Sequence, residues 1–183
     1  MIDLSIQAGW LAMARQVPSP NYNPRPTNTP IRLIVIHNIS LPPAQFGGGY
    51  IERFFQNQLD PSLHPYFEEI KDLQVSAHVL ITRLGEVIQF VSLDDRAWHA
   101  GRSCYQGVEN CNDFSIGIEL EGTDDLPFTE AQYQALTPLL NAIHQAYPAT
   151  IGHITGHSDI APNRKTDPGV CFDWSRVAVA ISP

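Results

Sequence analysis

Residues 156–169 bring several groups that could do chemistry into one short stretch. His157, Lys165 and Asp167 supply an imidazole, an ammonium and a carboxylate, and two prolines and a glycine interrupt any regular element. Because irregular backbone can aim such side chains at one point, we expect a loop that carries a functional site. Zinc accepts imidazole nitrogen and carboxylate oxygen, and a catalytic zinc keeps about three protein ligands. His157 and Asp167 are therefore two candidate ligands.

The strands that precede this segment must position a third ligand. Residues 31–37 are mostly apolar and β-branched, which predicts a strand buried on both faces and ending in His37. A rigid strand would hold a ligand well, although His37 taken alone is also compatible with a core histidine. Residues 114–121 predict a second central strand, in which Glu119 would be costly to bury unless it is paired or functional. Glu121 shares this face but is expected to be more exposed.

Taken together, the predicted central strands end in or carry His37, Glu119 and His157. Two histidines and the carboxylate of Asp167 form a ligand set found in hydrolytic zinc sites. Such a zinc ion would acidify a water molecule and polarise a carbonyl group. Glu119 could then move a proton from water to a leaving amine, and Lys165 could stabilise an oxyanion. These roles fit the hydrolysis of an amide bond.

The remaining patterns predict the surrounding elements. They indicate a short helix around 10–14, an extended proline-rich arm at about 18–30, a helix over 50–59, a loop over 60–75, a hairpin of 75–81 with 86–91, a capped helix over 129–147, a strand over 151–157 and a short helix over 173–181. Three histidines receive no chemistry at this stage. We expect His64 at the surface, His78 in the core or a cleft, and His144 facing solvent.

Composition limits the classes of function. The 183 residues suit one domain, and the net charge of −8 argues against a nucleic-acid partner and gives no support for binding to anionic membranes. No apolar run reaches the roughly 18 residues of a membrane span, and residues 1–16 lack a signal-peptide pattern. Three cysteines without a C-x-x-C pair indicate a reducing compartment, so we expect a cytoplasmic protein.

Five segments together resemble the type-2 N-acetylmuramoyl-L-alanine amidase family, which includes the peptidoglycan recognition proteins. In chain order the segments are Val35–Asn38, Ser76–His78, Ala97–Gly101, Asn112–Gly122 and Gly156–Gly169. The resemblance implies an α+β fold with a single domain over residues 1–183, in which a central mixed β-sheet is flanked by helices. It also implies one zinc ion per chain.

The resemblance assigns roles to individual residues. It implies zinc ligation by His37, His157 and Asp167, and catalysis by Glu119 and Lys165. By the same resemblance, substrate contacts would come from Asn38, Trp98 and Arg164. Similar sequences often carry arginines at the positions of Gln74 and Asn110. If those arginines hold carboxylates of the peptide, affinity or peptide preference would differ in this protein.

The resemblance further implies a reaction and its setting. The expected reaction is hydrolysis of the amide between the lactyl group of 1,6-anhydro-N-acetylmuramic acid and L-alanine, during peptidoglycan recycling. We expect a monomer that acts on small anhydromuropeptides, with no nucleic-acid or membrane partner. Two alternatives are a non-catalytic protein that binds peptidoglycan fragments and an envelope amidase that acts on intact murein. Product analysis and cell fractionation would distinguish them.

Overall fold

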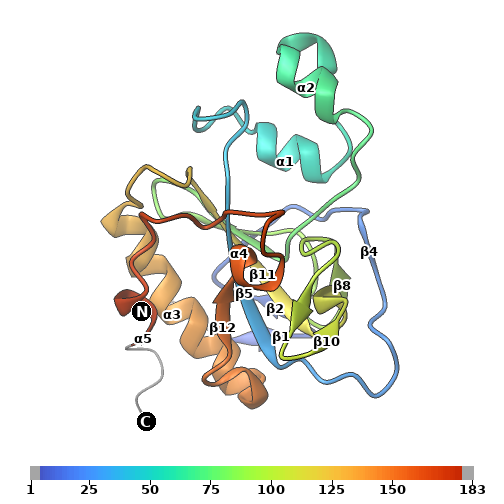
Figure 1. Ribbon diagram of the computed structural model, residues 1–183, viewed down its shortest axis with the longest axis vertical. Coiled ribbons are helices and arrows are strands. Elements are labelled where there is room, and N and C mark those ends of the chain that lie inside the picture. Colours follow the sequence, from blue (N-terminus) through green and yellow to red (C-terminus); the bar gives the residue numbers. More distant parts are fainter. Residues whose placement is uncertain (1–4, 179–183) are drawn as a thin grey trace.

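The computed structural model describes residues 5–178, which are built around one six-stranded sheet (Figure 1). The strand order is β12-β5-β11-β6-β7-β3. The strands are β3 (Arg15–Gln16), β5 (Leu33–Ile39), β6 (Val79–Ile81), β7 (Val87–Gln89), β11 (Ser115–Glu121) and β12 (Ile154–Gly156). All neighbouring pairs are parallel except β6 with β7, so the sheet is mixed. The predicted α+β fold with a central mixed sheet is confirmed.

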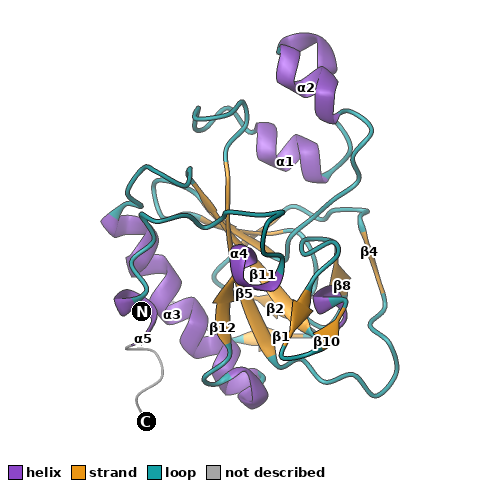
Figure 2. Ribbon diagram, in the orientation of Figure 1, coloured by secondary structure: helices purple, strands orange, loops and turns teal. Residues whose placement is uncertain are grey.

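Helices and short ladders surround this sheet (Figure 2). The helices are α1 (Tyr50–Phe55), α2 (Pro65–Ile70), α3 (Glu130–Ala146), α4 (His157–Ile160) and α5 (Ser175–Ala178), with single 3-10 turns at Pro61–Leu63, Cys111–Asp113 and Pro148–Thr150. The ladders are β1 (Ile6–Gln7) with β2 (Trp10–Leu11), β4 (Tyr22–Asn23) with β8 (Arg96–Ala97), and β9 (Cys104–Tyr105) with β10 (Val108–Glu109). Within the described residues, no helix is long and apolar enough to cross a membrane.

The two faces of the central strands have different chemistry. On β11, Ile116, Ile118 and Leu120 pack into the core beneath α3, which runs along one flank of the sheet (Figure 1). Because side chains alternate along a strand, Ser115, Gly117, Glu119 and Glu121 share the opposite face. That face is covered by α1 and α2 at one end and by the loop after β8 at the other. The polar face of β11 therefore lies between helices α1 and α2 at one end and the loop after β8 at the other.

Several predicted elements agree with the structure. The strands over 31–37 and 114–121 become β5 and β11, and the predicted hairpin is the antiparallel pair of β6 and β7. Thr129 caps α3 by accepting a hydrogen bond from the amide of Gln132, as the capping pattern predicts. The helix predicted over 50–59 is shorter and ends at Phe55. The C-terminal helix is described from Ser175 to Ala178, and the rest of its predicted range lies outside the described residues.

Two predicted elements are wrong. Residues 10–14, which were expected to form a helix, instead contain strand β2. The amide of Leu11 donates to the buried side chain of Gln89 and not to a carbonyl group of a helical turn. The loop expected over 60–75 contains helix α2. Its start is marked by His64, whose ring accepts from the amide of Tyr66, and by a proline in the first turn. His64 is therefore a half-buried helix cap.

The proline-rich arm at 18–30 is fastened to the rest of the fold by Arg25. The guanidinium of Arg25 donates to the carbonyl oxygens of Leu93, Asn112, Asp113 and Ser115, at 2.9–3.1 Å. Leu93 precedes β8, Asn112 and Asp113 lie in the 3-10 turn before β11, and Ser115 is the first residue of β11. Arg25 therefore ties the arm to the strand that carries Glu119.

Replacing Arg25 should destabilise the fold. We expect Arg25→Ala to lower the free energy of unfolding by about 2 kcal/mol or more, because four carbonyl groups lose a charged donor. Denaturant unfolding followed by circular dichroism measures this loss. The matched control is Arg53→Ala on α1, since that arginine is exposed. Equal stability of the two variants would show that the arm contributes little to the fold.

Candidate active site

Three potential metal ligands converge at the carboxyl edge of the sheet. His37 lies near the end of β5 and His157 follows β12, and these parallel neighbours pair Ile36 with Gly156. Nδ1 of His37 and Nδ1 of His157 lie 3.0 Å apart, and Oδ2 of Asp167 is 3.0 Å from the first and 3.1 Å from the second. In a tetrahedral zinc site with bonds of 2.0–2.1 Å, ligand atoms lie about 3.3 Å apart. The donor atoms and their spacing fit zinc.

The segment after β12 is more regular at its start than its composition indicates. His157 opens helix α4, a single turn whose entry is held by Asp159, which accepts from the amide of Gly156 and the hydroxyl of Thr155. The chain then returns, because the amide of Ser158 donates to the main-chain oxygen of Asp167 at 2.9 Å. This contact brings the side chain of Asp167 back to His157. The irregular loop that we expected begins only after α4.

The protonation states of His37 and Asp167 suit a metal. Burial lowers the pKa of His37 to about 4, although its contact with the Asp167 carboxylate opposes this shift. Burial would raise the pKa of Asp167, but its close contacts with His157 and His37 outweigh burial and hold that pKa well below its usual range. At neutral pH His37 is therefore uncharged and Asp167 is ionised. These are the forms in which such side chains bind metals.

Glu119 lies beside this group without being part of it. It is paired in register with His37 across β11 and β5, so both side chains leave the same face of the sheet. Glu119 is only 8% exposed, and its Oε2 has no hydrogen-bond partner. Burial, followed by the charge of Asp167, raises the pKa of Glu119 well above its usual range. A buried carboxylate without a partner is costly for stability, and such groups concentrate at functional sites.

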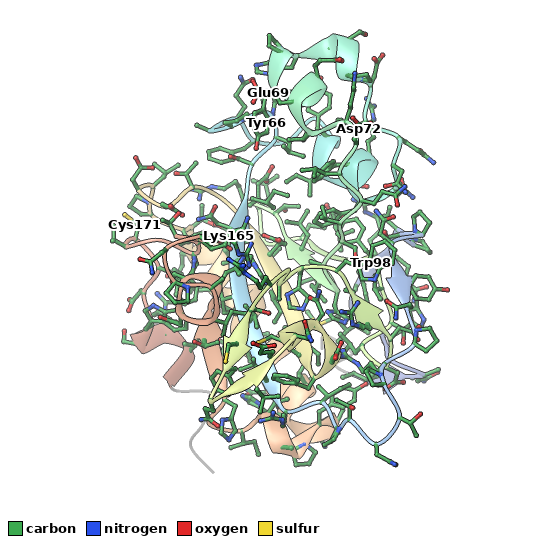
Figure 3. The ribbon with its side chains drawn as sticks, turned by 45° about the vertical axis from the view of Figure 1, so that its right-hand side comes forward. Tyr66, Glu69, Asp72, Trp98, Lys165 and Cys171 are labelled. Atoms are coloured by element: carbon green, nitrogen blue, oxygen red, sulfur yellow. The ribbon has the colours of Figure 1, made fainter. Side chains whose placement is uncertain are left out.

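A cavity of about 370 Å³ opens over these residues. Its floor is polar and includes Glu119 and the three potential ligands, and Phe54, Ile70 and Leu73 contribute to its apolar wall. In Figure 3, Tyr66 lies on the α2 side above Lys165 and Trp98, and all three line the cavity. The arrangement places a carboxylate, an ammonium group and a metal-ligand set around one space that could hold a small polar molecule.

The predicted substrate contacts are distributed unevenly. Asn38 and Trp98 line the cavity; the amide of Asn38 donates to Asp124, and the indole N–H of Trp98 donates to Asn23. Arg164 is not among the lining residues. Its guanidinium donates to the carbonyl oxygens of Ala100 and Arg102, each at 2.7 Å. Arg164 thus supports the loop beside His157 in the structure, and its contact with substrate stays a prediction.

Two sequence-based expectations about exposure are wrong. Glu121 is 4% exposed, because the amides of Gly47 and Arg83 come from two loops that cover the end of β11 and donate to its carboxylate. His144 is 5% exposed, because the turn after α3 folds back and places Thr150 against its ring. His78 is buried as expected, and its Nδ1 accepts from the amide of Gly117. None of these three residues lines the cavity over the potential metal site.

Sequence reasoning missed two buried residues that contact the site. The sequence assigns no role to His99, yet its Nδ1 lies 2.9 Å from Nε2 of His37. Ser115 lies at the start of β11, and its hydroxyl contacts the far side of the His99 ring. A weak signal was available, because Ser115, Gly117 and Glu119 break the apolar pattern of β11 at every second position.

Comparisons with known proteins identify the family. The N-acetylmuramoyl-L-alanine amidase family matches residues 27–170. The chain is 57% identical to the 1,6-anhydro-N-acetylmuramyl-L-alanine amidase AmpD of Citrobacter freundii over 97% of this chain and 95% of that protein. It is 56% identical to AmpD of Escherichia coli K12, over 97% of both chains.

Solved structures give the same result. A selenomethionine AmpD crystal structure superposes with a TM-score of 0.95 at 56% identity, covering 97% of this chain and 99% of the other. The amidase AmiD of E. coli, solved with anhydro-N-acetylmuramic acid-L-Ala-D-γ-Glu-L-Lys, superposes with a TM-score of 0.61 at 31% identity, covering 86% of this chain and 60% of AmiD. The sequence, the fold and the site agree, and this chain belongs to the N-acetylmuramoyl-L-alanine amidase family of amide hydrolases.

Proposed function

We propose that this protein hydrolyses the amide bond between the lactyl group of 1,6-anhydro-N-acetylmuramic acid and L-alanine in small anhydromuropeptides, using one zinc ion per chain. The observation that carries the proposal is the convergence of His37, His157 and Asp167 at a cavity that also contains Glu119 and Lys165. The AmpD relatives and the AmiD complex support the choice of substrate.

Each residue of the site has a distinct part in this reaction. His37, His157 and Asp167 would hold the zinc ion, which when bound acidifies water and polarises the scissile carbonyl. The free Oε2 of Glu119 takes a proton from the attacking water and returns it to the nitrogen of the leaving L-alanine. Lys165 attracts the negative charge that develops on the carbonyl oxygen. The buried floor of the cavity strengthens these charge interactions, because little water screens them.

The cavity walls suggest how the substrate is held. Asn38 presents an amide near the ligands, and Trp98 and Tyr66 offer aromatic faces on which a sugar ring could stack. Gln74 and Asn110 are exposed and uncharged. If peptide carboxylates reach these positions, we expect weaker binding than in relatives that carry arginine there.

We place the enzyme in the cytoplasm as a monomer that serves peptidoglycan recycling. The three cysteines are unpaired, and Cys104 among them is exposed, which suits a reducing compartment. The non-catalytic alternative requires a site that has lost a ligand or a catalytic group, whereas all five positions here hold competent residues. The envelope alternative requires activity on intact murein. Mass spectrometry of products from an anhydromuropeptide and from murein distinguishes these possibilities.

The metal assignment makes a quantitative prediction. We expect one zinc per chain by elemental analysis, and we expect His37→Ala and Asp167→Ala each to lose most of it, because two remaining ligands do not hold a catalytic zinc. Removing the metal with a chelator should abolish hydrolysis, and added zinc should restore it. His144→Ala is the matched control, since it removes a buried histidine that does not line the cavity. Unchanged zinc content in His37→Ala would refute the ligand assignment.

A further inference from the structure

A buried chain of hydrogen bonds leads away from His37 on the side opposite its metal-facing nitrogen. Nε2 of His37 lies 2.9 Å from Nδ1 of His99, and Nε2 of His99 lies 3.1 Å from Oγ of Ser115. The Ser115 hydroxyl in turn lies 2.6 Å from the carbonyl oxygen of Cys111. His37, His99 and Ser115 are 1%, 9% and 0% exposed, so water hardly competes for these contacts.

The carbonyl at the end of the chain determines the direction of every hydrogen bond in it. A carbonyl oxygen only accepts, so Ser115 must donate its single hydroxyl proton to Cys111. The oxygen of Ser115 therefore accepts the Nε2 proton of His99, which leaves Nδ1 of His99 as an acceptor. Nδ1 of His99 therefore accepts a hydrogen bond from the Nε2–H group of His37. A neutral imidazole carries one N–H, so Nδ1 of His37 keeps the lone pair that faces His157 and Asp167.

The surroundings of His99 hold its ring in this position. The main-chain amides of His99 and Ala100 both donate to Oδ1 of Asn112, at 3.1 and 2.8 Å. Its ring packs against β11 at Gly117, where an added Cβ atom would lie 2.5 Å from the ring. A side chain at 117 would thus displace His99 from His37.

The second histidine is supported differently. Nε2 of His157 lies 3.2 Å from the carbonyl oxygen of Ala100, which also only accepts. Nε2 of His157 therefore carries the proton, and its Nδ1 is free to bind the metal. The contact that fixes this tautomer is with a main-chain oxygen, which no side-chain substitution removes directly. The tautomer of His37, in contrast, depends on two side chains.

We propose that His99 and Ser115 are positioning residues that hold His37 in the tautomer and orientation needed to bind zinc. This role rests on the zinc site of the proposed function. Residues that orient a metal-bound histidine typically change metal affinity about 10–100-fold when they are replaced. Loss of the Ser115 hydroxyl frees the His99 ring to carry its proton on Nδ1, opposite the N–H of His37. His37 then favours protonation of Nδ1, which blocks the metal-binding lone pair.

The test measures zinc affinity directly, by competition with a chromophoric chelator at one fixed pH. We expect zinc to bind about 10–100-fold more weakly to His99→Phe and about 10-fold more weakly to Ser115→Ala. His99→Asn should recover most of the affinity, because its Oδ1 can accept the proton of His37. His144→Phe is the matched control and should bind zinc as the unmodified protein does. Nitrogen-15 spectra of the zinc-loaded protein should show the His37 proton on Nε2.

Three results would overturn the proposal. The first is that Ser115→Ala and His99→Phe both bind zinc as tightly as the unmodified protein does. This result would refute the positioning role but not the assignment of the zinc ligands. The second is a folded His99→Asn protein as weak as His99→Phe, which would assign the effect to ring packing. The third is an unmodified protein that binds no zinc, which would refute both the metal site and the role of the hydrogen-bond chain behind His37. Ser115→Ala removes one oxygen atom and keeps the test valid if His99→Phe does not fold.

Discussion

Glu119→Gln should retain zinc and the fold while kcat falls by about 10²-fold or more, the scale of general acid–base catalysis. The amide of glutamine keeps the volume of the side chain but cannot take a proton from water. Steady-state kinetics on an anhydromuropeptide, together with zinc analysis of the same samples, measure both quantities. Zinc content separates loss of chemistry from loss of the metal.

Glu121→Gln is the matched control for this experiment. Glu121 leaves the same face of β11 two positions later, but two main-chain amides occupy its carboxylate, whereas Oε2 of Glu119 is unpartnered. We expect Glu121→Gln to change kcat far less than Glu119→Gln does. An active Glu119→Gln enzyme together with an inactive Glu121→Gln enzyme would assign the proton transfer to Glu121.

The same substitution should also stabilise the protein once zinc has been stripped by a chelator. Burial raises the pKa of Glu119 above its usual range, so the folded state holds the proton more tightly than the unfolded chain does. The stability that this protonation contributes is present below the ordinary carboxyl range of about 4 and is lost as the pH rises. Glu119→Gln should therefore raise Tm at neutral pH, and the difference should shrink in acid. A lower Tm at neutral pH would contradict this reading of the buried carboxylate.

Lys165→Ala should lower kcat by about 10²-fold or more and leave zinc content and KM nearly unchanged, as when an oxyanion donor is removed. Lys165 lies two residues before Asp167, lines the cavity, and forms no salt bridge with any described residue. Asp159 and Asp173, its nearest alternative partners in sequence, instead accept from neighbouring main-chain amides and hydroxyls. An ammonium beside a metal site gains most when negative charge develops in the transition state.

Lys71→Ala is the matched control, because the chain has one other lysine and it pairs with Glu68 at the end of α2. We expect this variant to keep the kcat of the unmodified enzyme. If Lys165→Ala raises KM and leaves kcat unchanged, Lys165 binds substrate and does not stabilise the oxyanion. Lys165→Arg adds a further comparison, since it keeps the charge but changes its position.

Local patterns predicted the strands that position the site, because their signals lie within a few neighbouring residues. The apolar runs of β5 and β11 mark strands buried on both faces, and Thr129 with Gln132 marks the start of α3. Residue chemistry alone also singled out His37, Glu119, His157, Lys165 and Asp167, which the fold brings to one cavity. Their family was recognisable from five short segments in order.

Only the tertiary structure decided the surroundings of those residues, because each depends on contacts between segments far apart in the chain. Glu121 is buried by amides from residues 47 and 83, and β2 replaces the helix expected around 10–14 because Gln89 holds Leu11. The hydrogen-bond chain from His37 through His99 joins β5, the loop after β8 and the start of β11. Sequence determined which groups could do the chemistry, whereas the packing of distant segments determined their burial, partners and tautomers.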